Sequence, residues 1–392
     1  METMSPVERV LRTLEGKPVD RVPVFCAMME TRTASEVLGK PLISGKTMMN
    51  LPGVKFIFDK WGPGLTDSLF IPSMMKTIHK RNRAEVEMGF DAAWIWDFHE
   101  WICLDHSRLA LRTGSIFEAR DDGYGELTYM YQKPGITSPE EFESWPYWPD
   151  SDRIAHDAYK YYSRFMKQYG DRCCVFGMGF MGGLHESMNW TFGIDKVPLW
   201  IKRHPAYVQR FLDMMEDIWM KVSAGMLDAG VPVVLLGDDF CHKTGPFLNP
   251  KMVEELFGIR YRRIIKYVHD RGAKFCLHSC GDNTRLFDLF IDWGVDALHA
   301  YETTSNVDIF NEKKIHGDKV TIVGGVGIDY LLTEYSHDEE IVERVKLLCE
   351  KLGPGGRFIL SPVHGESGTP AHKLRVMLDA AYKYGEYPIA VS

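Results

Sequence analysis

The chain has 392 residues, of which 45% are hydrophobic and 26% charged, a composition that suits one large folded domain or two smaller ones. Its formal net charge of −8 argues against a nucleic-acid-binding protein, and no run approaches the roughly 18 apolar residues that span a bilayer. Residues 1–20 lack the apolar core of a signal peptide, and eight cysteines in so long a chain do not make a disulfide framework, so we expect a cytoplasmic protein.

Two short apolar runs in the first part of the chain predict strands at residues 21–26 and 92–96. From residue 171 onward, short apolar runs alternate with longer amphipathic segments, which is typical of a parallel sheet covered by helices. These later runs predict six strands, at residues 174–177, 233–236, 274–277, 297–300, 320–324 and 358–361. Eight strands that alternate with helices close a (β/α)8 barrel, so we expect an α/β protein with the TIM-barrel fold.

The region between residues 104 and 149 interrupts this alternation. It contains the turn sequence Asp121-Asp122-Gly123 and, after it, the alternating segment 127–131. We therefore expect an insertion with a hairpin after the second strand. The whole chain, residues 1–392, is expected to form a single domain with an elaborated N-terminal region.

The strand at residues 274–277 ends in the sequence His278-Ser279-Cys280-Gly281. Because residues two apart in a strand point to the same side, the imidazole of His278 and the thiolate of Cys280 are expected to face one point, as zinc ligands do. Barrel enzymes place their functional residues at the carboxyl ends of the strands. Glu302 and His364 follow two other predicted strands there. We predict that these four residues bind a zinc ion, although a single histidine at a strand end is more often a hydrogen-bonded rim residue.

Further polar and apolar side chains follow the other predicted strands. Asp238 and Asp239 leave a fully apolar strand, and such a pair can act as a general base beside a partner whose pKa is raised by repulsion. The alternative is that one of them caps the turn at residues 245–246. We favour a substrate-pocket role for at least one, and both are predicted as catalytic residues. The residues predicted to contact a substrate are Met28, Glu30, Asp97, Phe180, His185 and His242.

Six segments taken together resemble the uroporphyrinogen decarboxylase superfamily and, within it, the branch of cobalamin-linked methyltransferases. The resemblance extends from about residue 9 to residue 384. The segments that carry it are Arg21-Val-Pro-Val24, Gly89-Phe-Asp-Ala-Ala93, Gly245-Pro-Phe-Leu-Asn-Pro250, His278-Ser-Cys-Gly281, Gly324-Gly325 and Ser361-Pro-Val-His-Gly365.

Two departures from the family pattern bear on the chemistry. The decarboxylases follow their first strand with an arginine-rich motif that binds the carboxylates of a porphyrinogen, whereas this chain has Ala27-Met28-Met29-Glu30. An acid beside a polyanionic substrate weakens binding, so porphyrinogen decarboxylation is not expected. Thiol-methylating relatives bind zinc with one histidine and two cysteines, and here His364 stands in the region of the second cysteine.

The resemblance therefore implies a zinc-dependent methyltransferase that moves a methyl group from a methoxylated aromatic substrate to the cobalt of a separate corrinoid protein. A site with a single thiolate is more Lewis-acidic than a thiolate-rich site and suits polarising a methyl–oxygen bond. Several aromatic residues lie near the expected mouth and would fit a flat aryl ether, although they would equally fit an ordinary core. These residues are Trp94, Trp96, Phe98, Trp101, Phe180 and Trp190.

Three alternatives remain open from the sequence. The first is methylation of a thiol from methylcobalamin, and the second is decarboxylation of another substrate without a metal, with Asp97 or Asp239 as the acid. The third is a non-enzymatic role in corrinoid handling. The resemblance also implies a homodimer.

Overall fold

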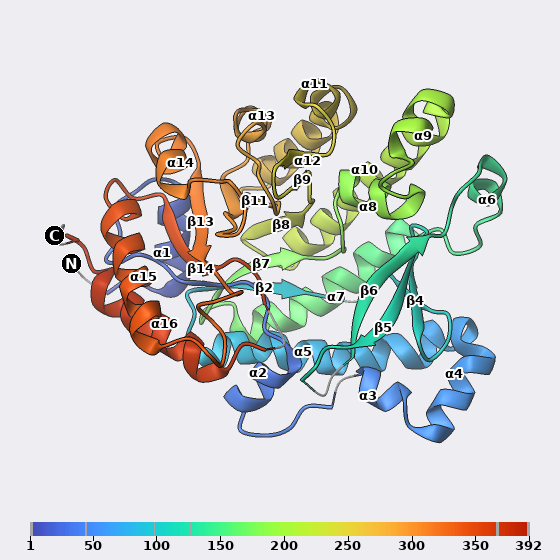
Figure 1. Cartoon of the computed structure of the whole chain (residues 1–392), viewed down its shortest axis with the longest axis horizontal. Coiled ribbons are helices and arrows are strands. Elements are labelled where there is room, and N and C mark those ends of the chain that lie inside the picture. The colour runs from blue at the N-terminus through green and yellow to red at the C-terminus, as the bar shows by residue number, and fades with distance from the viewer. Residues whose placement is uncertain (1–2, 44, 98, 125–126, 366–367, 390–392) are drawn as a thin grey trace.

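The computed structural model describes residues 3–43, 45–97, 99–124, 127–365 and 368–389. Its centre is a sheet of eight parallel strands in the order β1-β2-β7-β8-β11-β12-β13-β14 (Figure 1). The first and last strands meet, because Val24 forms a parallel bridge with Leu360, and the Leu360 N–H donates to the Pro23 carbonyl at 2.9 Å. The predicted (β/α)8 barrel is therefore confirmed. The strands are β1 (Phe25–Cys26), β2 (Ala92–Trp96), β7 (Cys174–Met178), β8 (Val233–Gly237), β11 (Lys274–His278), β12 (Ala297–Ala300), β13 (Thr321–Val326) and β14 (Phe358–Pro362).

Helices surround this barrel and follow or precede its strands (Figure 1). None of the helices in the described part of the chain is long and apolar enough to cross a membrane. The helices are α1 (Pro6–Leu14), α2 (Thr31–Val37), α3 (Gly45–Met49), α4 (Pro52–Leu65), α5 (Ile71–Met88), α6 (Pro139–Ser144), α7 (Ser151–Tyr169), α8 (Leu184–Phe192), α9 (Val197–Arg203), α10 (Pro205–Asp228), α11 (Pro250–Val253), α12 (Ile259–Asp270), α13 (Phe287–Trp293), α14 (Ile309–His316), α15 (Asp338–Leu352) and α16 (Ala371–Tyr384). Two π-helical turns, Thr66–Phe70 and Glu254–Gly258, join α4 to α5 and α11 to α12.

The barrel strands are continuous apolar runs because both of their faces are covered. Every residue of β2, β7, β8 and β14 is buried, as expected for parallel strands with helices outside and packed side chains inside. The first strand is shorter than predicted. Pro23 has no N–H to donate, and the Val24 N–H donates instead to the Asp91 carboxylate at 2.9 Å, so the ladder begins at Phe25.

The insertion after the second strand forms an antiparallel sheet of four strands, more than the single hairpin expected there. In the order β3-β4-β5-β6, they are β3 (Trp101–Cys103), β4 (Arg108–Leu111), β5 (Ser115–Asp121) and β6 (Leu127–Pro134). The sheet lies beside α4 at one side of the barrel (Figure 1). Phe117 packs edge-on against Trp190 of α8 with ring centroids 5.5 Å apart, so this sheet is joined to the helix that follows β7.

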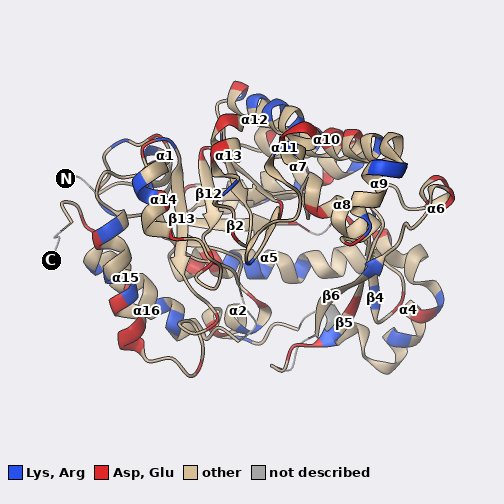
Figure 2. Ribbon diagram, turned by 45° about the horizontal axis from the view of Figure 1, so that its top comes forward, with Lys and Arg blue, Asp and Glu red and all other residues tan. Residues whose placement is uncertain are grey.

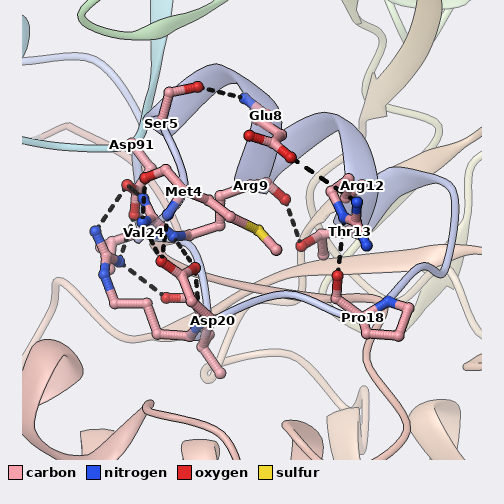
Figure 3. A network of polar contacts seen from close by, with 12 residues as sticks. Met4, Ser5, Glu8, Arg9, Arg12, Thr13, Pro18, Asp20, Val24 and Asp91 are labelled. Carbon is pink, nitrogen blue, oxygen red and sulfur yellow. Dashed lines mark hydrogen bonds and ion pairs between the residues drawn. The ribbon is translucent and has the colours of Figure 1, made fainter. Parts of the chain in front are cut away.

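A buried ionic network ties α1 to the start of β2 (Figure 3). The Arg9 guanidinium donates to Asp20 and to Asp91, each at 2.6 Å, and Arg21 pairs with the same Asp91 at 2.6 Å. The side chain of Asp91 is 1% exposed, so these two arginines rather than water contact its carboxylate. The network holds the N-terminal helix against the end of the barrel opposite the carboxyl ends of the strands.

Candidate functional site

Three of the predicted metal ligands converge at the carboxyl ends of the strands. His278 is the last residue of β11, Cys280 follows it by two positions, and His364 lies just beyond β14. The Cys280 Sγ atom is 3.2 Å from His278 Nε2 and 3.1 Å from His364 Nε2. One potential ligand atom from each residue lies within 4.8 Å of the others. We call His278, Cys280 and His364 the His-Cys-His cluster.

Glu302 lies at the edge of this cluster. Its Oε1 atom is 3.3 Å from His364 Nε2, and its Oε2 atom accepts a hydrogen bond from the Gly281 N–H at 3.1 Å. The hydrogen bond with His364 lowers the pKa of Glu302. The carboxylate is therefore placed either to orient His364 or to add an oxygen ligand beside it. All four residues predicted from the sequence thus lie together.

Asp239 faces the cluster and was not predicted as part of it. Its Oδ1 atom accepts from the Cys280 N–H at 2.8 Å and lies 3.8 Å from His278 Nε2. A third of its side chain remains exposed. Burial raises the pKa of Asp239, while the Cys280 N–H and His364 act in the opposite direction. Asp239 is thus a carboxyl group that can carry a proton beside the cluster.

Asp238 points away from the cluster and holds the start of α8. Its carboxylate accepts hydrogen bonds from the backbone N–H groups of His185 at 3.0 Å and Glu186 at 2.6 Å. The Tyr261 hydroxyl donates to the same carboxylate at 2.5 Å. A Cβ atom at Gly183 would lie 2.4 Å from Asp238, so only glycine allows this approach. Burial raises the pKa of Asp238 to about 7. These contacts favour a structural role over the catalytic role predicted from the sequence.

His299, which the sequence argument did not single out, fixes the tautomer of His278. It pairs with His278 in the register of β12 and β11, and the two Nδ1 atoms are 2.6 Å apart. His299 Nε2 lies 3.2 Å from the Pro362 carbonyl, which only accepts hydrogen bonds, so this nitrogen carries the proton. In a neutral ring Nδ1 of His299 is then an acceptor, and His278 must donate from its own Nδ1.

The same chain of hydrogen bonds frees Nε2 of His278 for a metal. Burial lowers the pKa of His278 well below its usual value and that of His299 to about 3, so both rings are neutral. An unprotonated Nε2 atom then faces the Cys280 sulfur. A neutral imidazole whose other nitrogen is hydrogen-bonded is the usual form of a zinc-binding histidine.

The donor set fits zinc. One sulfur, two imidazole nitrogens and a carboxylate oxygen of the nearby Glu302 are four ligands of the kinds that zinc accepts in a tetrahedral site. Burial, and then Asp239 and Glu302, raise the pKa of the Cys280 thiol well above its usual value. A divalent cation reverses this effect, because it stabilises the thiolate directly.

Aromatic side chains lie at different distances from the cluster. The Trp94 ring is 4.9 Å from the His278 ring, and among the described residues its buried Nε1 atom has no hydrogen-bond partner. Trp101 and Trp190 pack against Phe117 of the insertion instead. The prediction for Phe98 falls outside the described residues. The Trp94 ring is therefore in contact with the His278 member of the cluster.

The residues predicted to contact substrate separate into two groups. Met28 and Glu30 line a small cavity together with His364, and Glu30 pairs with Arg81 at 2.9 Å. His242 is exposed on the rim and accepts from the Thr244 N–H at 3.3 Å. These three residues lie where the sequence argument expected them, at the ends of the strands.

The other three predicted contacts are buried away from the cluster. Phe180 is 1% exposed and packs against Trp219, because the segment after β7 turns into the core rather than over the mouth. His185 is 0% exposed and stacks on Phe240 at 4.9 Å, and burial lowers its pKa to about 4. Asp97 is buried, 3.4 Å from His99 Nδ1.

Comparisons with known proteins agree with the fold. A family model described as uroporphyrinogen decarboxylase (URO-D) matches residues 131–384. A uroporphyrinogen decarboxylase of Dictyostelium discoideum is 22% identical over 177 residues, which are 42% of this chain and 43% of that protein. The match thus spans less than half of that relative. A solved structure of a methyltransferase from Methanosarcina mazei has a TM-score of 0.63 at 15% identity, covering 97% of this chain and 99% of that one.

Proposed function

The chain belongs to the uroporphyrinogen decarboxylase family, and from that premise we propose that it is a zinc-dependent methyltransferase. Its reaction would move a methyl group from a methoxylated aromatic compound to the cobalt of a separate corrinoid protein. The likeness to a methyltransferase over nearly the whole chain supports this branch of the family. The observation that carries the proposal is the convergence of His278, Cys280 and His364.

The composition of the cluster favours removal of a methyl group from oxygen. When bound there, zinc supplies a Lewis acid that draws electron density from an ether oxygen. The cluster contributes one thiolate and two neutral imidazoles, and it therefore neutralises less of the ion's charge than a thiolate-rich set does. His299 and the Pro362 carbonyl keep His278 in the required tautomer.

The surrounding residues would orient the substrate and manage the proton. The Trp94 ring beside His278 offers a face for an aryl group, and its Nε1 is a donor left for a ligand atom. As the methyl group leaves to cobalt(I), the ether oxygen keeps the bonding electron pair and must take up a proton. The Asp239 carboxyl has a raised pKa and is a third exposed, so we assign it the donation of that proton.

Porphyrinogen decarboxylation fits the mouth less well. The mouth residue Glu30 is an acid, and the nearby Arg81 is already paired with it at 2.9 Å. Arg81 also donates to the Met29 carbonyl at 2.7 Å. These contacts leave little free positive charge for a polycarboxylate at this side of the mouth.

Metal content and turnover test the proposal together. Wild-type protein purified without chelator is expected to hold about one zinc per chain, and the Cys280→Ser variant much less. Wild type mixed with cob(I)alamin and a set of methoxylated benzoates is expected to form methylcobalamin, which is followed by absorbance. His278→Ala should abolish this reaction, whereas His156→Ala, which alters an exposed histidine of α7, should leave it unchanged.

The possible outcomes separate the alternatives. Wild-type protein without zinc, or full turnover by His278→Ala, would contradict the proposal. Demethylation of methylcobalamin by added thiols, without any reaction of aryl ethers, would assign the site to thiol methylation. Release of carbon dioxide from a carboxylate substrate by the metal-free protein would assign it to decarboxylation.

A further inference from the structure

A second cavity lies outside the barrel, between α5 and α7. Its volume is about 810 Å³, within the range of small-molecule sites. None of the residues of the His-Cys-His cluster lines it. In Figure 1, α7 crosses the middle of the view and α5 lies below it. The cavity is lined by Asp67, Ile71, Pro72, Met75, Lys76, His79, Lys80, His99, Arg153, Asp157, Lys160, Tyr161 and Arg164.

Each of the two helices lines this cavity with two cations that form no ion pair in the described part of the chain. Lys76 and Lys80 are four residues apart on α5, and Lys160 and Arg164 are four residues apart on α7. Residues at this spacing are neighbours on a helix, so each pair brings two like charges together, which destabilises the helix. Within the described residues, none of the four forms an ion pair or a side-chain hydrogen bond. Figure 2 shows the blue segments along α5.

The acids that face the cavity do not neutralise these cations. Asp67 is already bound by Arg112 at 2.6 Å and by Arg153 at 2.8 Å. Asp157 is the other acid of the lining, so two acids stand against five lysine and arginine residues there. A region of positive charge thus stands on a chain whose net charge is −8. The pKa of His79 is consistent with this positive charge, because burial lowers it and the nearby Arg164 and Arg83 lower it further.

Part of the cavity wall is apolar and aromatic. Ile71 and Met75 of α5 line it, as does Tyr161 of α7, whose ring lies 6.2 Å from that of His79. His99, beyond the end of β2, also lines the cavity. A ligand with an apolar body could therefore contact this wall while its charged group reaches the cations.

We propose that this cavity binds a small organic anion, with a phosphate or carboxylate group on an aromatic or aliphatic body. The four unpaired cations at Lys76, Lys80, Lys160 and Arg164 would neutralise the anionic group, and the apolar wall would bind the rest of the molecule. A phosphate is favoured because several cations from two helices can contact its oxygens at once. The site is separate from the metal cluster and does not depend on the reaction proposed for it.

Calorimetric titration with phenyl phosphate, inorganic phosphate and phenol tests both halves of the site. Phenyl phosphate should bind more tightly than inorganic phosphate, and phenol should not bind measurably. Raising sodium chloride from 50 to 300 mM should weaken binding several-fold, because the cations are exposed. The Lys160→Glu variant should raise the Kd at least tenfold. Lys202→Glu makes the same charge change at an exposed residue of α9 outside the lining and should leave the Kd within twofold.

Two further measurements locate the bound probe. His278→Ala should bind phenyl phosphate as wild type does, because the cavity lies outside the cluster. Circular dichroism at increasing temperature checks that Lys160→Glu remains folded. Lys80→Glu, on α5, tests the cations of the other helix in the same titration. The proposal is overturned if phenyl phosphate does not bind, or if binding is lost in His278→Ala and kept in Lys160→Glu. Binding of a hexaglutamate peptide without binding of phenyl phosphate would instead assign the cavity to an acidic protein segment.

Discussion

At the scale of single residues, the members of the His-Cys-His cluster could be predicted from the sequence, but the residues that hold them in place could not. His278 and Cys280 are two positions apart at the end of an apolar run, and this spacing alone predicts that they face one point. His299 also lies in a predicted strand, and its importance depends on the register that pairs it with His278. A strand that is buried on both faces shows no alternation of apolar and polar residues, so its register with the next strand is not visible in the sequence.

His299 gives a residue-scale prediction. The His299→Ala variant removes the acceptor for Nδ1–H of His278, so the other tautomer becomes accessible and Nε2 is no longer held unprotonated. We expect zinc affinity to fall by about 10–100-fold. Competition with a chromophoric chelator measures this affinity directly, without any assay of turnover.

A conservative variant separates tautomer control from packing. In His299→Gln the side-chain amide again provides an acceptor, so part of the lost affinity should return. His316→Ala is a control at another buried histidine, one that pairs with Glu312 at 2.8 Å and not with His278. If His299→Ala bound zinc as wild type does, the proposed hydrogen-bond chain would have no role in metal binding.

At the scale of elements, the barrel strands were predicted because both their faces are buried, whereas the insertion was predicted only in part. The expected hairpin became a sheet of four strands whose first strand begins at Trp101, before the expected start of the insertion. Short strands such as β3, with three residues, carry too little alternation to be recognised. The sequence also does not predict which way the Asp238 side chain points, because this depends on the start of α8 lying beside the end of β8.

The contrast between Asp238 and Asp239 gives an element-scale prediction. Asp238→Ala leaves two backbone N–H groups at the start of α8 and the Tyr261 hydroxyl without their acceptor. We expect the free energy of unfolding to fall by about 2–4 kcal/mol, from the lost cap and the buried donors. Urea denaturation measures this change. Asp239→Ala should change the free energy of unfolding by less than about 1 kcal/mol and should instead reduce turnover. Equal destabilisation by both variants would contradict the separate roles.

At the scale of the whole molecule, the ionic network of Arg9, Asp20 and Asp91 sets part of the pH dependence of stability (Figure 3). Burial alone would raise the pKa of Asp20, but the hydrogen bonds from Arg9 and from the Met4 N–H outweigh it and lower the pKa to about 2. A carboxyl with a lowered pKa in the folded state stabilises the fold above its usual pKa near 4. This stabilisation is lost as the pH falls from about 4 to 2.

The Asp20→Asn variant makes this dependence measurable. The difference in the free energy of unfolding between wild type and Asp20→Asn should be roughly 2 kcal/mol at pH 6. It should begin to shrink below about pH 4, where the unfolded carboxyl takes up a proton. Asp171→Asn, at an exposed acid, should differ little from wild type at either pH. A difference that stayed constant from pH 6 to pH 3 would contradict a lowered pKa for Asp20.

The position of β14 in the strand order has a consequence for any ion held at the mouth. Cys280 follows β11, which ends at His278, whereas His364 follows β14, and β12 and β13 lie between these two strands. A bound cation would therefore join two strands that do not pair with each other. Its binding would stiffen the carboxyl ends of the four strands from β11 to β14 as a unit.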